Sequence, residues 1–246
     1  MLILASTFAM LFYIRSNIQY ERKYNLLYRN KILEPLLKLV CSELKYKTIS
    51  EDDISEIEKD YNGAKFNKPY LIFSITDCIE GFISDKIYIK LVYIFAKKRV
   101  KNINPQDVFA GVFASTKCDK DIKTYVKISK NRQKIIEKEN KVEMNSQEFK
   151  KYFDVYSEND VITKQLLTNE MMESLLYFYK KYKLKFEVVF VNNTIYLRFF
   201  SGDIFAAPLI GSSINEDLFR TYSVLKFVVE VTKKLNEIME KIEVEK

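Results

Sequence analysis

The stretch LKFEVVFVNNTIYLRFF, residues 184–200, decides the fold. It holds two runs rich in β-branched and aromatic residues, a composition typical of strands, on either side of Asn192-Asn193. Asparagine tolerates the positive φ angles that a type I′ turn requires, so a two-residue loop is expected between the runs. The stretch therefore predicts a β-hairpin.

A long helix is expected after the hairpin, from Glu216 to Val244, with its cap within Ser213–Asn215. Its apolar residues recur at helical spacing, and only Thr232 interrupts that face. We expect the helix to pack on the hairpin's sheet. Its distal part, Leu235 to Ile242, is expected to overrun the sheet and to bury its apolar stripe against a partner or a second copy. The face consists of Leu218, Tyr222, Leu225, Val228, Leu235, Met239 and Ile242.

Three shorter helices are expected before the hairpin, each with a capping residue. Ser146 caps a helix through Phe153, Ser157 caps one from Glu158 to Leu166, and Thr168 caps a third. The third carries Met172, Leu175, Leu176 and Tyr179 on one face.

Further upstream the sequence changes to β patterns, with short polar loops that favour an antiparallel sheet. Asn104-Pro105 is expected to break the chain between two of the strands. Residues 117–141 carry nine basic and four acidic residues, which favours a solvated connection between two subdomains. The expected strands are Tyr70–Ile75, Ile87–Phe95, Asp107–Ala114 and Thr124–Ile128.

These patterns predict an α+β fold: an N-terminal hydrophobic anchor and helix, an antiparallel sheet subdomain, then C-terminal helices packed on a sheet that contains the hairpin. The expected divisions are a partial or short transmembrane anchor (1–14), a basic then acidic helical region (15–60), a mainly β subdomain (61–130), and an α+β subdomain with the long C-terminal helix (131–246). Within the second division, residues 16–45 are expected to be helical, kinked or restarted at Pro35, and Ser50 to cap an acidic helix.

Residues 1–14, MLILASTFAMLFYI, carry no charge. Three interpretations compete: a membrane anchor, a buried core helix and a secretory signal. Fourteen residues are short of the roughly 20 that cross a bilayer, a core helix would be unusually apolar all round, and a signal would need a basic region first. A tilted anchor, or one with upstream residues missing from this sequence, fits best.

The basic collar after this segment favours the anchor. Residues 15–31 hold five basic residues against Glu21 alone, and such an excess marks the cytoplasmic side of a bacterial inner membrane. We therefore expect anionic lipid to lie next to Arg15, Arg22, Lys23 and Arg29.

Composition excludes several classes of chemistry. The 246 residues carry a net charge of +7 and no histidine, which removes Ser-His-Asp triads, Cys-His dyads and histidine-ligated zinc. Cys41, Cys78 and Cys118 are widely spaced, so reduced thiols are expected rather than disulfides or a zinc site. The basic run lacks interleaved aromatic residues, so nucleic-acid binding is not expected.

Residues 142–209 carry a set of segments in a recognisable order: Val142-Glu143, Ser146–Ser157 (SQEFKKYFDVYS), Gln165–Met172 (QLLTNEMM), the strand pair 186–199 and Ser201-Gly202. In this order they resemble the bacterial family of unknown function numbered 3137, and Lys31–Leu37 and Phe109–Phe113 also look like family segments. The family often has Ala-Arg where this chain has Thr163-Lys164. The resemblance implies an inner-membrane protein with N-terminal spans, often two, and a cytoplasmic α+β domain. It implies no activity, cofactor or catalytic residue.

Two functional hypotheses remain: a membrane-tethered, non-catalytic binding or scaffold domain that contacts a protein partner or itself, and an enzyme that uses carboxylate or lysine chemistry without a recognisable motif. No catalytic, cofactor-binding or metal residue is predicted. The best polar candidates for chemistry are Asp154, Tyr156 and Asp203. Asp154 is more simply expected in a turn between helices, accepting backbone N–H groups, with Phe153 and Val155 buried.

Overall fold

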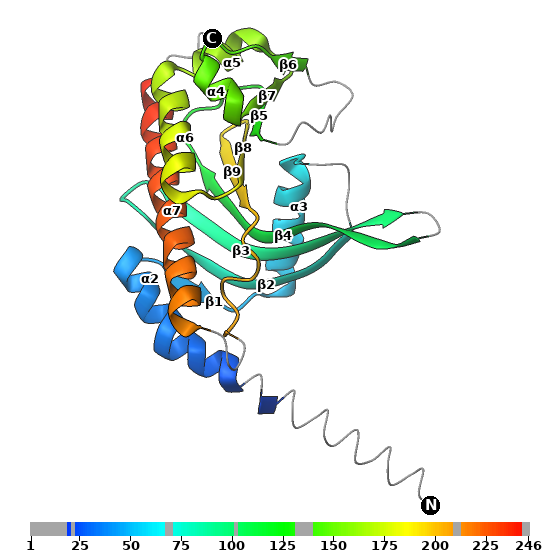
Figure 1. Cartoon of the computed structure of the whole chain (residues 1–246), viewed down its shortest axis with the longest axis vertical. Coiled ribbons are helices and arrows are strands. Elements are labelled where there is room, and N and C mark those ends of the chain that lie inside the picture. Colours follow the sequence, from blue (N-terminus) through cyan, green and yellow to red (C-terminus); the bar gives the residue numbers. More distant parts are fainter. Residues whose placement is uncertain are drawn as a thin grey trace, which may run out of the picture.

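The computed structural model describes residues 19–20, 23–66, 71–100, 103–130, 140–208 and 213–242. Nine strands in these ranges form one antiparallel sheet in the order β1-β2-β3-β4-β9-β8-β5-β7-β6. With its flanking helices the sheet confirms the predicted α+β class (Figure 1). The strands are β1 (Lys45–Lys47), β2 (Leu71–Phe82), β3 (Tyr88–Val100), β4 (Ile103–Lys117), β5 (Tyr125–Ser129), β6 (Asn140–Val142), β7 (Asp154–Ser157), β8 (Phe186–Val191) and β9 (Thr194–Phe199).

The predicted hairpin consists of β8 and β9, and it joins the strands β1 to β4 to the strands β5, β7 and β6 in one sheet. β9 pairs with β4 on one side, and β8 pairs with β5 on the other. Val191 lies opposite Thr194, so the loop has two residues, as expected. The positive φ angle falls on Asn192, at 52°, and not on both asparagines, so the type I′ assignment is wrong.

Two strand predictions need correction. Asn104-Pro105 does not break the chain: both residues lie inside β4, where the register with β3 jumps from Gln106 to Ile103. Such an irregularity tolerates a proline, which has no N–H to donate to the ladder. The basic stretch 117–141 is not solvated throughout, because β5 lies buried between β7 and β8.

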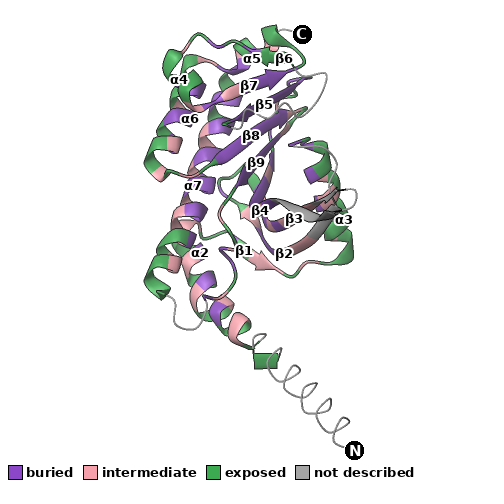
Figure 2. Ribbon diagram, turned by 45° about the vertical axis from the view of Figure 1, so that its right-hand side comes forward, coloured by how far each residue is buried: buried purple, intermediate pink, exposed green. Residues whose placement is uncertain are grey.

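Helices cover the two faces of the sheet unequally. The larger core lies under the N-terminal helix (residues 23–40), α6 (Asn169–Tyr182) and α7 (Ile214–Lys241), and the smaller core lies under α3 (Glu51–Gly63) on the opposite face (Figures 1 and 2). Strand side chains alternate between the faces. In β8, Val188 joins the larger core and Val189 the smaller one.

The N-terminal helix contains a π-helical turn, η1 (Arg29–Leu33), followed by α2 (Glu34–Val40). Pro35 occupies the first turn of α2, where its missing N–H is tolerated. The expected helix is thus present over residues 19–20 and 23–40, and the π-helical turn passes into α2 at Glu34, next to Pro35. The helix ends at Val40 and does not reach residue 45, because Lys45 already belongs to β1.

Helix α7 packs as expected on the sheet, but the apolar side chains of its distal part are already buried within this chain. The Phe227 ring lies 5.1 Å, between centroids, from both Phe186 and Phe199. Leu235 and Met239 are buried by the chain itself, and the Lys120 ammonium donates to the Glu240 carbonyl at 2.6 Å and to that of Ile242. The predicted partner interface at Leu235–Ile242 is therefore wrong.

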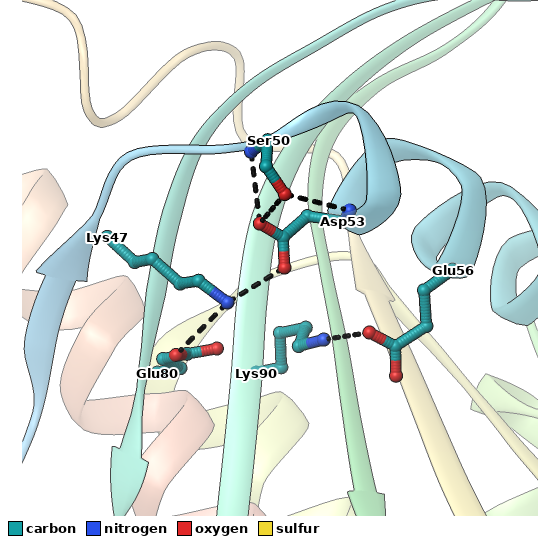
Figure 3. Close-up of polar contacts among 6 residues, drawn as sticks. All are labelled: Lys47, Ser50, Asp53, Glu56, Glu80 and Lys90. Atoms are coloured by element: carbon teal, nitrogen blue, oxygen red, sulfur yellow. Dashed lines mark hydrogen bonds and ion pairs between the residues drawn. The ribbon is translucent and has the colours of Figure 1, made fainter.

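Helix α3 begins with a capping box. Ser50 Oγ accepts from the Asp53 N–H at 3.2 Å, and the Asp53 carboxylate accepts from the Ser50 N–H at 3.0 Å (Figure 3). Lys47 on β1 reaches the Asp53 carboxylate at 2.7 Å, and it lies 3.4 Å from Glu80 on β2. The hydrogen bond from Lys47 lowers the pKa of the Asp53 carboxyl. Together with the pair between Lys90 and Glu56 at 2.7 Å, these contacts hold α3 on the sheet.

The three short helices are α4 (Gln147–Tyr152), α5 (Asp160–Leu166) and α6. Ser146 and Thr168 cap α4 and α6 as predicted. The cap of α5 is Asn159 and not Ser157, because Ser157 belongs to β7 and its buried hydroxyl donates to the Tyr125 carbonyl at 2.8 Å.

Candidate functional site

An arginine–carboxylate pair lies in the middle of the sheet. Glu187 on β8 is directly opposite Arg198 on β9, and their side chains form an ion pair with 3% and 2% of their surfaces exposed. Ser129 on β5 donates to the Glu187 carboxylate at 2.7 Å. The hairpin geometry produces this contact, because a two-residue loop places residues 187 and 198 side by side.

Aromatic rings enclose the Arg198 guanidinium. It lies 4.6 Å from the Phe66 ring centroid, 5.3 Å from Phe109 and 5.4 Å from Phe200. The buried Lys127 ammonium donates to the Phe66 carbonyl at 2.7 Å. These contacts hold the segment after α3 on the sheet, so the buried charges of Arg198 and Lys127 have a structural role.

Two of the predicted polar candidates lie beside this cluster. In the register of β5 and β7, Asp154 is opposite Ser129 and Tyr156 is opposite Lys127. Asp154 therefore lies in a strand and not in the expected turn, and its carboxylate pairs with Lys141 at 2.7 Å. Tyr156 is buried, as are Phe153 and Val155.

A second arginine–carboxylate pair joins the N-terminal helix to the sheet. Arg29, at the start of η1, pairs with Asp77 on β2, and the Tyr46 hydroxyl donates to the same carboxylate. The Arg29 guanidinium lies 4.7 Å from the Tyr46 ring centroid. Asp77 has a φ of 20° where the β2–β3 register shifts, so an irregularity in the strand presents the carboxylate to the helix.

The third polar candidate, Asp203, belongs to the same region. Its carboxylate accepts from the N–H groups of Phe205 and Ala206 at 3.0 and 3.1 Å. Burial raises the pKa of this carboxyl, and the nearby Asp77 charge adds to the effect. The loop that contains it is tied to the N-terminal helix, because Tyr24 donates to the Pro208 carbonyl and Asn25 accepts from the Ala207 N–H, both at 3.2 Å.

Apolar side chains gather where the N-terminal helix meets the start of α7. A pocket of about 230 Å³ lies there, lined by Tyr24, Leu27, Tyr28, Lys31, Ile32, Pro208 and Ile214. Leu26 is 57% exposed, Leu27 58% and Ile214 50%. We name these three side chains, with the exposed Lys23 and Lys31, the end surface. In the described ranges, six of the twelve exposed large apolar side chains come from residues 19–40 and 214–219.

A larger hollow of about 530 Å³ lies between α6 and α7, lined by Glu170, Tyr177, Glu230 and Lys234 among others. Two of its carboxylates pair with lysines of the facing helix: Lys234 on α7 reaches Glu170 on α6 at 2.8 Å, and Lys181 on α6 reaches Glu230 on α7 at 2.7 Å. These contacts tie the two helices together.

The cysteines are free thiols, as expected. Burial raises the pKa of Cys78 and of Cys118 to about 12 each, so both thiols stay protonated near neutral pH. In the part of the chain that the structure describes, no group of three or more potential metal ligands comes together.

The predicted anchor and lipid contacts fall partly outside the described residues, which exclude 1–14, Arg15 and Arg22. Lys23 is exposed, whereas Arg29 is paired with Asp77. None of the described helices combines the length and the apolar character needed to cross a bilayer.

The sequence interpretation missed Glu187, Arg198, Lys127 and Asp77. The first two could have been found, because each is a charge in an apolar strand of the predicted hairpin and the two-residue loop pairs them. Lys127 and Asp77 meet partners 61 and 48 residues away in the chain, and no local pattern indicates such contacts.

Comparison with known proteins gives the family but no activity. No curated protein matches the chain. The crystal structure of the mycobacterial trehalose monomycolate transport factor A, TtfA, aligns over 87% of this chain and 98% of its own, with 9% identity and a TM-score of 0.47. Residues 107–237, just over half of the chain, match the family described as "Protein of unknown function (DUF3137)". The resemblance seen in the sequence is thus confirmed, and the chain belongs to the DUF3137 family.

Proposed function

We propose that this protein is a membrane-tethered binding or scaffold module without catalysis of its own, held at the bacterial inner membrane by residues 1–14. The observation that carries the proposal is the end surface, where Leu26, Leu27 and Ile214 are half exposed or more. Neighbouring exposed apolar side chains are typical of a surface that meets a membrane or a partner. Two of these side chains, Leu26 and Leu27, follow the uncharged segment closely in the chain.

The domain is proposed to face the cytoplasm. Arg15, Arg22 and Lys23 follow the uncharged segment, and an excess of basic residues stays on the cytoplasmic side of a span. Anionic lipid next to these residues, and a protein partner or a second copy bound by the domain, are part of the proposal. Nucleic acid is not.

The contacts of the polar candidates support a non-catalytic domain. Asp154 pairs with Lys141, and Asp203 accepts from two backbone N–H groups. Both carboxylates thus have structural partners, which accounts for their presence without a reaction.

Fractionation tests the tether. Full-length protein in bacterial membranes is washed with alkaline carbonate, and we expect it in the pellet. A Leu11→Asp variant is the matched control, because a charge within the uncharged segment opposes insertion and should release protein. Wild-type protein in the supernatant would contradict the proposal.

A second experiment distinguishes a non-catalytic binding module from an enzyme. Asp154→Ala, Tyr156→Ala and Asp203→Ala are expressed in a strain that lacks the gene, and protein level and function are measured together. We expect function to follow abundance, because these changes act through stability. A variant with normal level, normal fold and normal partner binding but no function would identify a catalytic residue.

A further inference from the structure

The end surface combines apolar side chains with positive charge. Leu27 and Ile214 line one pocket with Lys31, and Leu26 and Lys23 belong to the same helix as Leu27. The charge of Arg29 is directed inward, because Asp77 pairs with it. Apolar side chains beside exposed lysines are the composition of surfaces that lie in the headgroup region of a bilayer.

Covalent geometry places this surface close to the membrane. Five peptide units connect Ile14, at the end of the uncharged segment, with Gln19, so the two residues lie at most about 18 Å apart. In Figure 1 the N-terminal helix and the start of α7 occupy one end of the long axis, and α5 lies at the other end. A tether at residues 1–14 therefore brings the end surface, and not α5, to the bilayer.

The small size of the patch favours lipid over a protein partner. Stable protein interfaces bury about 800 Å² on each partner. Three half-exposed apolar side chains, two of which line a pocket of about 230 Å³, supply only part of such an area. Because the tether already keeps the domain at the membrane, a weak contact suffices to orient it.

We propose, on the basis of the tether proposed above, that the folded domain docks on the bilayer through Leu26, Leu27 and Ile214, with Lys23 and Lys31 at the level of anionic lipid phosphates. Docking fixes the orientation of the domain, with the α4–α5 end directed into the cytoplasm. The sheet and its α5 end then remain accessible to other molecules.

The absence of tryptophan from the chain permits a direct test. Full-length Leu27→Trp is reconstituted into vesicles of phosphatidylcholine and phosphatidylglycerol, with or without bromine on the acyl chains. Val161→Trp on α5 is the matched control, because Val161 is 67% exposed and Leu27 is 58% exposed. We expect brominated lipid to quench most of the Leu27→Trp fluorescence and to leave the Val161→Trp fluorescence unchanged.

The outcomes separate docking from tethering. If both variants bind the vesicles but neither is quenched, or if Leu27→Trp and Val161→Trp are quenched equally, the docking proposal is overturned and the tether proposal stands. Protein absent from the vesicles after an alkaline wash overturns the tether and the docking with it. If Leu27→Trp does not fold, Leu26→Trp takes its place. Lys23→Glu with Lys31→Glu should reduce the quenching of Leu27→Trp, and unchanged quenching contradicts the role of the lysines.

Discussion

Arg198 and Arg29 each pair with a carboxylate and lie against at least one aromatic ring, but their surroundings differ. Arg198 and Glu187 are almost fully buried, whereas the Arg29 side chain is 31% exposed over a carboxylate that is 4% exposed. The first pair holds the middle of the sheet, and the second holds the N-terminal helix, which precedes the sheet and leads from the proposed tether. A buried pair is costly to break, while a partly hydrated one can rearrange. The comparison predicts that breaking the central pair lowers the free energy of unfolding more than breaking the pair at the N-terminal helix does.

The largest effect is expected at the centre. Glu187→Ala leaves the Arg198 charge buried without its carboxylate and should lower the free energy of unfolding by about 3–5 kcal/mol in urea melts. Glu187→Leu combined with Arg198→Met should recover much of this loss, because it removes both charges. If the single change costs no more than a surface substitution, the buried pair does not hold the sheet.

The apolar centre should respond almost as strongly. Leu225 on α7 is fully buried, so Leu225→Ala should cost about 2–5 kcal/mol. Glu237→Ala, at an exposed position of the same helix, should stay within about 0.5 kcal/mol. Equal unfolding midpoints for the two variants would show that α7 does not pack as described.

The second pair should give an intermediate effect. Arg29→Ala leaves the buried Asp77 carboxylate with the Tyr46 hydroxyl as its remaining partner in this cluster, and should cost about 1–3 kcal/mol in the same assay. Lys23→Ala, an exposed basic residue of the same helix, should change little. A cost for Arg29→Ala as large as that for Glu187→Ala would remove the distinction between centre and end.

The smallest effect on stability is expected at the end surface. Leu27→Ala makes the same chemical change as Leu225→Ala, but Leu27 is 58% exposed, so the cost should be within about 0.5 kcal/mol. If Leu27→Ala lowered the free energy of unfolding by several kcal/mol in urea melts, Leu27 would be part of the hydrophobic core and not an exposed contact residue.

The elements predicted correctly depend on local signals. The hairpin follows from two runs rich in β-branched and aromatic residues around Asn192-Asn193, and the caps of α3, α4 and α6 follow from Ser50, Ser146 and Thr168. What failed depends on distant partners. The strand β5 was predicted, but within a stretch expected to be solvated. The sequence does not reveal that the Lys127 ammonium donates a hydrogen bond to the distant Phe66 carbonyl. The order of the nine strands is likewise a property of non-local pairing.

The candidate site was less predictable than the fold. Asp154 was assigned to a turn because its neighbours suggest one, whereas its place in β7 depends on pairing with β5. The end surface could be anticipated only through Lys23 and the preceding basic residues. Leu26 and Leu27 fit a helical pattern in the sequence, and only the packing of the helix shows that they are exposed.

Hydrogen exchange on vesicles tests most directly whether the end surface, and not the α5 end of the domain, meets the membrane. Wild-type protein is compared with a variant that carries Lys23→Glu, Leu27→Glu and Lys31→Glu but keeps residues 1–14. We expect slower amide exchange in the wild type over residues 23–33 and 214–220, and equal exchange in α5 and β7. Equal exchange at the N-terminal end, or protection of α5 in the wild type, would contradict the account.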